Sequence, residues 1–182
     1  MNTARHPKIL LVDDEPRTVE MIVEVFVRQL NAHITCVSKA EDALDVEILE
    51  PHDALIAEIN LPTMNGITLA ERIMELRRRP VILMSNDPNL GQAIGAMRAG
   101  TVDFFTKPFD IECLLDATER ALKQAGEQRR LVQRHHRMRS LVRRVIRERR
   151  ELNQRVDLIC RDLVGAHRRL VHRVLDAENS RV

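Results

Sequence analysis

Short apolar runs alternate with longer amphipathic segments over the first 125 residues. The apolar runs have the pattern of parallel strands buried on both faces, and they cover residues 8–12, 33–37, 54–58, 81–84 and 102–105. Between them, apolar residues recur with the 3.6-residue period of a helix. This predicts helices over residues 16–30, 40–49, 67–78, 89–98 and from about 110 onward. Strands and helices that alternate in this way form an open, doubly wound parallel sheet, so we expect a five-stranded α/β domain over residues 1–125.

A different pattern begins after residue 125. Apolar residues recur every seven residues, and others follow four residues after members of that series, as in the seam of a coiled coil. The seam consists of Leu131, Met138, Val142, Val145, Leu152, Val156, Ile159, Leu163, Ala166 and Leu170. A single helix cannot bury such a stripe, so we predict that the fifth helix extends into a coiled coil that makes a homodimer. A tail that folds back on the first domain is the alternative, and the seam leaves parallel or antiparallel pairing open.

The charge of the chain is divided at the same place. Residues 1–125 hold 13 Lys and Arg against 20 Asp and Glu, whereas residues 126–182 hold 16 Arg against 7 acids. Opposite charge and different patterning indicate two structural units, a domain over 1–125 and an Arg-rich helical tail over 126–182. We interpret the basic stretch 129–150 as the solvated face of the coiled coil, which suits an acidic protein partner. A helix that binds DNA or RNA is the less favoured alternative.

Several other classes of protein are disfavoured by what the sequence lacks. No apolar run is long enough to span a membrane, and the first residues have no apolar signal segment. The three cysteines are odd in number and contain no CxxC pair, as expected of reduced thiols in the cytoplasm. The sequence has no GxxxxGK[ST] loop and no helix-turn-helix pattern. We therefore expect a cytoplasmic protein with no membrane segment and no enzymatic output.

Polar side chains stand where four of the predicted strands end. Asp13 and Asp14 follow the first strand, Glu58 ends the third, Ser85 follows the fourth and Lys107 follows the fifth. The carboxyl ends of parallel strands meet at one edge of a sheet. Neighbouring carboxylates need a cation between them, and oxygen ligands suit Mg²⁺, while a hydroxyl and an ammonium can cradle phosphoryl oxygens. The pattern predicts a phosphate-handling site with Asp13, Asp14 and Glu58 as metal ligands.

These motifs resemble the CheY-like receiver domain of bacterial response regulators, which has a flavodoxin-like fold. The resemblance rests on the runs Leu10–Glu15, Asn60–Gly66, Ile82–Ser85 and Ala99–Phe109, which match in order over about residues 8–125. It implies a part in two-component signal transduction by phosphorelay. It also implies that Asp13 and Asp14 are the metal acids, Ser85 the switch hydroxyl and Lys107 the phosphate-binding lysine. Phe104 would be the aromatic residue that moves inward on activation.

One position departs from the family. Its third strand ends in the aspartate that accepts a phosphoryl group from a histidine kinase, and this chain has Glu58 there. The extra methylene moves the carboxylate by roughly 1.5 Å, about one C–C bond, and a 1 Å error can cost about 10²-fold in rate.

We therefore predict an atypical, phosphorylation-independent response regulator that dimerises, acts through protein–protein interaction and binds Mg²⁺ weakly if at all. Two interpretations of Glu58 stay open. In the first, the longer carboxylate approaches Lys107 and Ser85, mimics the phosphorylated state and biases Phe104 inward. In the second, the switch is inactive and the sheet survives as a platform for dimerisation.

Overall fold

The computed structural model describes the backbone of residues 6–179 and the side chains of residues 6–165. Within this range the predicted strands and helices all occur, and they occur in the predicted order. The elements are β1 (Lys8–Val12), α1 (Pro16–Leu30), β2 (His33–Val37), α2 (Ala40–Leu49), β3 (Ala54–Glu58), α3 (Gly66–Leu76), β4 (Val81–Ser85), α4 (Leu90–Arg98), β5 (Asp103–Thr106) and α5 (Ile111–Asn179).

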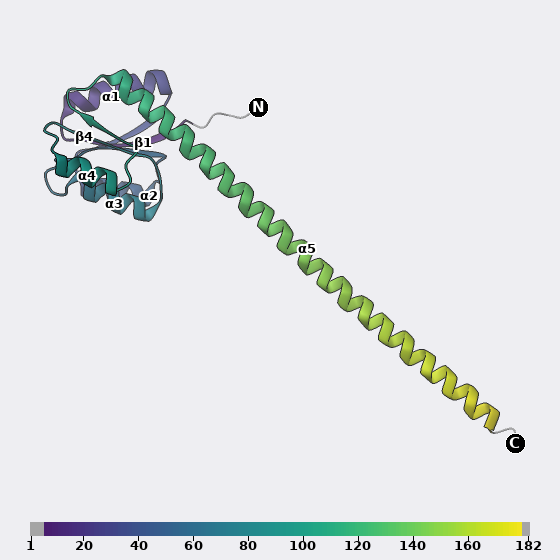
Figure 1. Ribbon diagram of the computed structural model, residues 1–182. Helices are drawn as coiled ribbons and strands as arrows, with labels where there is room; N and C mark the ends of the chain where they lie inside the picture. The colour runs from purple at the N-terminus through teal and green to yellow at the C-terminus, as the bar shows by residue number, and fades with distance from the viewer. Residues whose placement is uncertain (1–5, 180–182) are drawn as a thin grey trace. The chain divides into compact units, whose positions relative to one another are not determined.

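The strands form one parallel sheet in the order β2-β1-β3-β4-β5. Figure 1 shows α1 on one side of this sheet and α3 and α4 on the other. The chain runs outward from β1 to β2 and then returns to the other side of β1 for the remaining strands. The strand order therefore reverses between β1 and β3, and ligands of doubly wound sheets bind outside the carboxyl ends of the strands at this reversal. The predicted fold, a five-stranded doubly wound parallel sheet, is confirmed.

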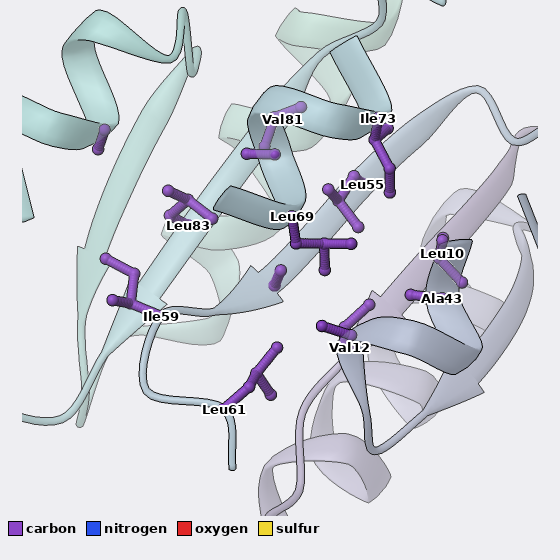
Figure 2. Close-up of a cluster of buried hydrophobic side chains, with 14 residues drawn as sticks. Leu10, Val12, Ala43, Leu55, Ile59, Leu61, Leu69, Ile73, Val81 and Leu83 are labelled. Atoms are coloured by element: carbon purple, nitrogen blue, oxygen red, sulfur yellow. The ribbon is translucent and has the colours of Figure 1, made fainter. Parts of the chain in front are cut away.

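Each face of the sheet is covered by helices. Successive strand residues point to opposite faces, so Leu10 and Val12 lie on one face while Ile9 and Leu11 lie on the other. Helices α2, α3 and α4 pack on the first face, where Figure 2 shows Leu69 and Ile73 of α3 against the strands. Helix α1 and the beginning of α5 pack on the second face. Apolar runs buried on both faces account for the nearly continuous hydrophobic strands seen in the sequence.

Helix α3 ends at Leu76, two residues before the predicted end. Arg77 has an extended backbone, with φ −161° and ψ 127°. The next residues enter the interior, because Arg79 is only 5% exposed and its Nη1 donates to the carbonyl of His52 at 3.0 Å. Arg79 also precedes Pro80, and a residue before proline disfavours the helical region. The helical period of the sequence continues to Arg78, but the buried contact of Arg79 ends the helix earlier.

The chain divides into two compact units, residues 1–129 and 130–182, and helix α5 belongs to both. In the second unit the seam residues from Leu131 to Leu163 are between 49% and 65% exposed, so none of them is buried in the single chain. The side chains of the last two predicted seam residues, Ala166 and Leu170, lie outside the described residues. Among the described residues, no helix is both long enough and apolar enough to cross a membrane.

Candidate functional site

The carboxyl edge of the sheet brings together four of the five residues that the strand ends predicted. Asp13 follows β1, Glu58 ends β3, Ser85 ends β4 and Lys107 follows β5. These four residues are at most 8% exposed. Asp14, the fifth, is exposed. The structure therefore places two buried acids, one buried hydroxyl and one buried ammonium at this edge of the sheet.

The turn after β3 holds Glu58 in place. The amide of Gly66, the first residue of α3, donates to the carbonyl of Ile59 at 2.8 Å. A Cβ atom at position 66 would lie 2.1 Å from the backbone oxygen of Glu58, which is a severe clash. Glycine is therefore required for α3 to begin directly against the end of β3. The Asn65 side chain caps this helix by accepting from the amide of Ile67 at 2.8 Å.

Lys107 is the centre of charge in the site. Its Nζ donates to Oδ2 of Asp13 at 2.7 Å and lies 2.9 Å from Oε2 of Glu58. The more exposed Glu15 adds a longer contact of 3.5 Å to the same ammonium. One buried cation thus faces two buried carboxylates. Removal of any one of these charges would leave another buried charge without full compensation, which is destabilising.

The carboxylate of Glu58 is held on both of its oxygens by different kinds of contact. Its Oε1 accepts from the backbone amides of Ile59 and Asn60, each at 3.1 Å. Its Oε2 takes no hydrogen bond within the described part of the chain and faces the Lys107 ammonium as an ion pair. The side chain of Glu58 is therefore folded back over the end of its own strand, with Oε2 paired with the lysine.

The pKa values of Asp13 and Lys107 are both raised, but for different reasons. Burial raises the pKa of Asp13 above its ordinary value of 3.8, although the hydrogen bond from Lys107 opposes this effect. Burial lowers the pKa of Lys107, but the contacts with Asp13 and Glu58 outweigh burial and raise it above 10.5. Lys107 is consequently charged throughout the physiological pH range.

A three-acid Mg²⁺ site does not fit this arrangement of side chains. Asp13 and Glu58 converge, but the cation between them is the Lys107 ammonium, and Asp14 is exposed. Among the described residues, no group of three His, Cys, Asp or Glu side chains is placed to hold a metal ion. A divalent ion that used Asp13 and Glu58 would have to compete with Lys107 for both of them.

The predicted switch residues lie beside this centre. The hydroxyl of Ser85 has hydrogen-bond contacts with the side chains of Asn60 and Gln92, each at 3.4 Å. Phe104 in β5 is partly buried and packs against the hydrophobic cluster beneath α3 and α4. Sequence reasoning did not single out Asn60 or Gln92 as site residues. The signal for Gln92 was the spacing Asn89-x-x-Gln92, which is typical of a capping box at a helix start.

A comparison with protein families decides how this site is classified. The family model described as the response regulator receiver domain matches residues 9–119, more than half of the chain. The chain belongs to this family. Response regulator receivers take part in two-component signalling, which agrees with the acids, hydroxyl and lysine at the sheet edge.

Individual relatives show the same relationship. The chain is 34% identical over 122 residues to the response regulator protein TodT of Pseudomonas putida, covering 66% of this chain and 53% of TodT. It therefore spans about half the length of that relative. The receiver domain of an HD domain-containing protein from Pseudomonas fluorescens is 27% identical, with a TM-score of 0.64 over 68% of this chain and 99% of that domain. A CheY-like receiver from Methanospirillum hungatei, at 21% identity, has a TM-score of 0.65 over 68% of this chain and 99% of its own, and supports the fold alone.

Proposed function

We propose that this chain is an atypical response regulator that works without phosphorylation, forms a homodimer through α5 and acts by binding other proteins. The observation that carries the proposal is the contact of 2.9 Å between Glu58 Oε2 and Lys107 Nζ. The lysine that would bind an incoming phosphoryl group is already neutralised by Glu58 and Asp13. The glutamate also stands roughly 1.5 Å too far along its side chain for in-line transfer.

The contacts of Glu58 support part of the mimic interpretation. Its carboxylate reaches Lys107, as a phosphoryl group on a shorter side chain would. Its single negative charge is smaller than the −1.5 to −2 of a phosphoryl group, and the Ser85 hydroxyl is bonded to Asn60 and Gln92 instead. We therefore propose that Glu58 holds Lys107 as a phosphoryl group would. The Ser85 hydroxyl, in contrast, stays hydrogen-bonded to Asn60 and Gln92 rather than to Glu58.

Treatment with a small phosphodonor tests the proposal. We expect no phosphorylated species in the intact-mass spectrum after incubation of the full chain with acetyl phosphate and Mg²⁺. A Glu58→Asp variant restores the reach of the family's acceptor, and we expect its labelling to be about 10²-fold faster, since a 1 Å error costs about that factor. A stable adduct on the native chain that disappears in Glu58→Gln would contradict the proposal.

The proposed dimer rests on the exposed seam of α5. Apolar residues at the first and fourth heptad positions pack as knobs into holes when two helices pair, and those from Leu131 to Leu163 are exposed in the single chain. Sedimentation equilibrium of the 21.0 kDa chain should give twice that mass.

Ile159→Lys places a charge in the seam and should raise the dimer dissociation constant about a hundredfold or more, because an unpaired buried charge costs several kcal/mol. Gln154→Lys, midway between the seam residues Leu152 and Val156 and not itself in the seam, is the control; equal effects of both variants would exclude this seam.

The arginines of α5 indicate the chemistry of a partner. A hollow of about 580 Å³ on this helix is lined by His136, Arg139, Ser140, Arg143, Arg144 and Arg147. None of these six residues occupies a seam position, so we expect them to stay accessible after pairing. An acidic protein surface is the partner we propose, and nucleic acid is the second candidate. Binding to DNA would fall steeply with salt, because each neutralised phosphate adds about −0.9 to the slope of log K against log salt.

A further inference from the structure

The side chains of Asn60, Ser85 and Gln92 form a closed triangle of hydrogen bonds at the mouth of the site. Asn60 Nδ2 donates to Ser85 Oγ at 3.4 Å, and Ser85 Oγ donates to Gln92 Oε1 at 3.4 Å. Gln92 Nε2 closes the triangle by donating to Asn60 Oδ1 at 3.0 Å. The three residues come from the turn after β3, the end of β4 and the first turn of α4. The triangle therefore joins three separate segments at one point.

One corner of the triangle is bonded directly to the charged site. The backbone amide of Asn60 donates to Glu58 Oε1 at 3.1 Å, so the position of Asn60 depends on the Glu58 carboxylate. Ser85 is fully buried, and its hydroxyl finds its hydrogen-bond contacts in Asn60 and Gln92. A hydrogen bond to a charged group is roughly twice as strong as one between neutral groups. The hydrogen bond from Asn60 to the charged Glu58 is therefore the strongest in a series of contacts that runs from Glu58 through Asn60 and Ser85 to Gln92.

The other corner is part of helix α4. Gln92 Oε1 accepts from the amide of Asn89 at 3.3 Å, while Asn89 Oδ1 accepts from the amide of Gln92 at 2.9 Å. This reciprocal pair is a capping box, which satisfies the free amides at the start of a helix. Gln92 thus has two separate tasks. It caps α4, and its amide group also binds Asn60 and Ser85 at the site.

We propose that Gln92 is a positioning residue that couples Glu58 to helix α4 through Asn60 and Ser85. The first turn of α4 is then fixed by the state of the charged site. The inference does not depend on whether the chain is phosphorylated, because each contact in it exists in the present structure. It differs from a capping role alone, since a cap would stabilise α4 without making the helix sensitive to residue 58.

Hydrogen exchange of the full chain tests the coupling, with the amides of residues 90–98 as the readout. Glu58→Gln replaces the charged acceptor of Asn60 with a neutral one, and we expect exchange in α4 to become about three- to tenfold faster. This corresponds to the loss of about half of a charge-assisted hydrogen bond. Gln92→Ala should accelerate the same amides about tenfold, because the residue makes more than one hydrogen bond at the start of α4. Amides of β3 serve as a reference that the fold is intact.

The deciding measurement combines these substitutions. In a Gln92→Ala background, Glu58→Gln should no longer change exchange in α4, because the connection has been removed. In an Asn89→Ala background the cap is weakened but the triangle stays, so the effect of Glu58→Gln should persist. Gln92→Glu retains the cap acceptor and the bond from Ser85 but loses the donor to Asn60, so it should reduce the response to Glu58→Gln without abolishing it. The proposal is overturned if the effects of Glu58→Gln and Gln92→Ala simply multiply, or if Asn89→Ala abolishes the response as completely as Gln92→Ala does.

Discussion

Replacement of Lys107 by methionine should lower the free energy of unfolding by about 3–5 kcal/mol near neutral pH, the usual cost of removing one partner from a buried ion pair. The ammonium lies 2.7 Å from Asp13 and 2.9 Å from Glu58, and the side chains of both acids are at most 2% exposed. Methionine has a similar length but no charge, so two buried carboxylates would face each other without a cation. Denaturant unfolding of the full chain at fixed protein concentration measures the effect.

A second substitution separates the ionic effect from lost packing. Glu58→Gln in the Lys107→Met background removes one of the two repelling charges, and it should restore part of the lost stability. Lys123→Met, at an exposed position of α5, is the matched control and should change stability by less than about 0.5 kcal/mol. If Lys107→Met is no more harmful than Lys123→Met, the ion pairs of Lys107 do not stabilise the fold.

The loss of unfolding free energy caused by Lys107→Met should also depend on pH, and it should become smaller as the pH rises. Burial lowers the pKa of Lys107, but Asp13 and Glu58 raise it to a net value above 10.5. A basic group whose pKa is raised in the folded state contributes stability below its unfolded pKa, and this contribution disappears as the pH rises through the folded value. The difference between the native chain and Lys107→Met should therefore be full at neutral pH and shrink above about pH 10.5.

The sequence was sufficient for the sheet and for the position of the charged site. Runs such as Leu10–Val12 and Val81–Met84 are apolar at every position, which is typical of a strand covered on both faces. A parallel sheet places Asp13, Glu58 and Lys107 at one edge, because all carboxyl ends lie there.

The sequence could not show which hydrogen bonds the side chains at that edge would form. The apposition of Glu58 and Ser85 on neighbouring strands suggested contact between them, but Ser85 is bonded to Asn60 and Gln92. The choice depends on the rotamer of Glu58, which its own backbone neighbours set by donating two amide hydrogen bonds to Oε1. Residue periodicity carries no information on such local geometry. The same is true of Gln92, whose capping spacing predicts a helix start and not a bond across to β4.

A second buried ion pair escaped the sequence analysis for a different reason. Three consecutive arginines precede Pro80, and their side chains look equivalent in the sequence. In the structure Arg77 and Arg78 are exposed, whereas Arg79 is buried and its Nη1 bonds to Glu47 of α2. Glu47 also accepts from His52, whose Nδ1 lies 3.0 Å away. Charged residues in a run are usually solvated, so only tertiary structure distinguishes the one that enters the core.

Arg79→Met should accordingly cost about 3–5 kcal/mol of unfolding free energy, because it leaves the buried carboxylate of Glu47 without its cation. The side chains of both residues are at most 2% exposed, so water cannot replace the lost partner. The neighbouring Arg78→Met is a close control, since it makes the same chemical change one residue away on the surface. Adding Glu47→Gln to Arg79→Met should recover part of the loss, because a neutral amide can remain buried beside His52 at lower cost. Equal stabilities of the Arg78→Met and Arg79→Met variants would mean that this edge of the sheet tolerates an unpaired Glu47, and that α3 ends at Leu76 for a reason other than the burial of Arg79.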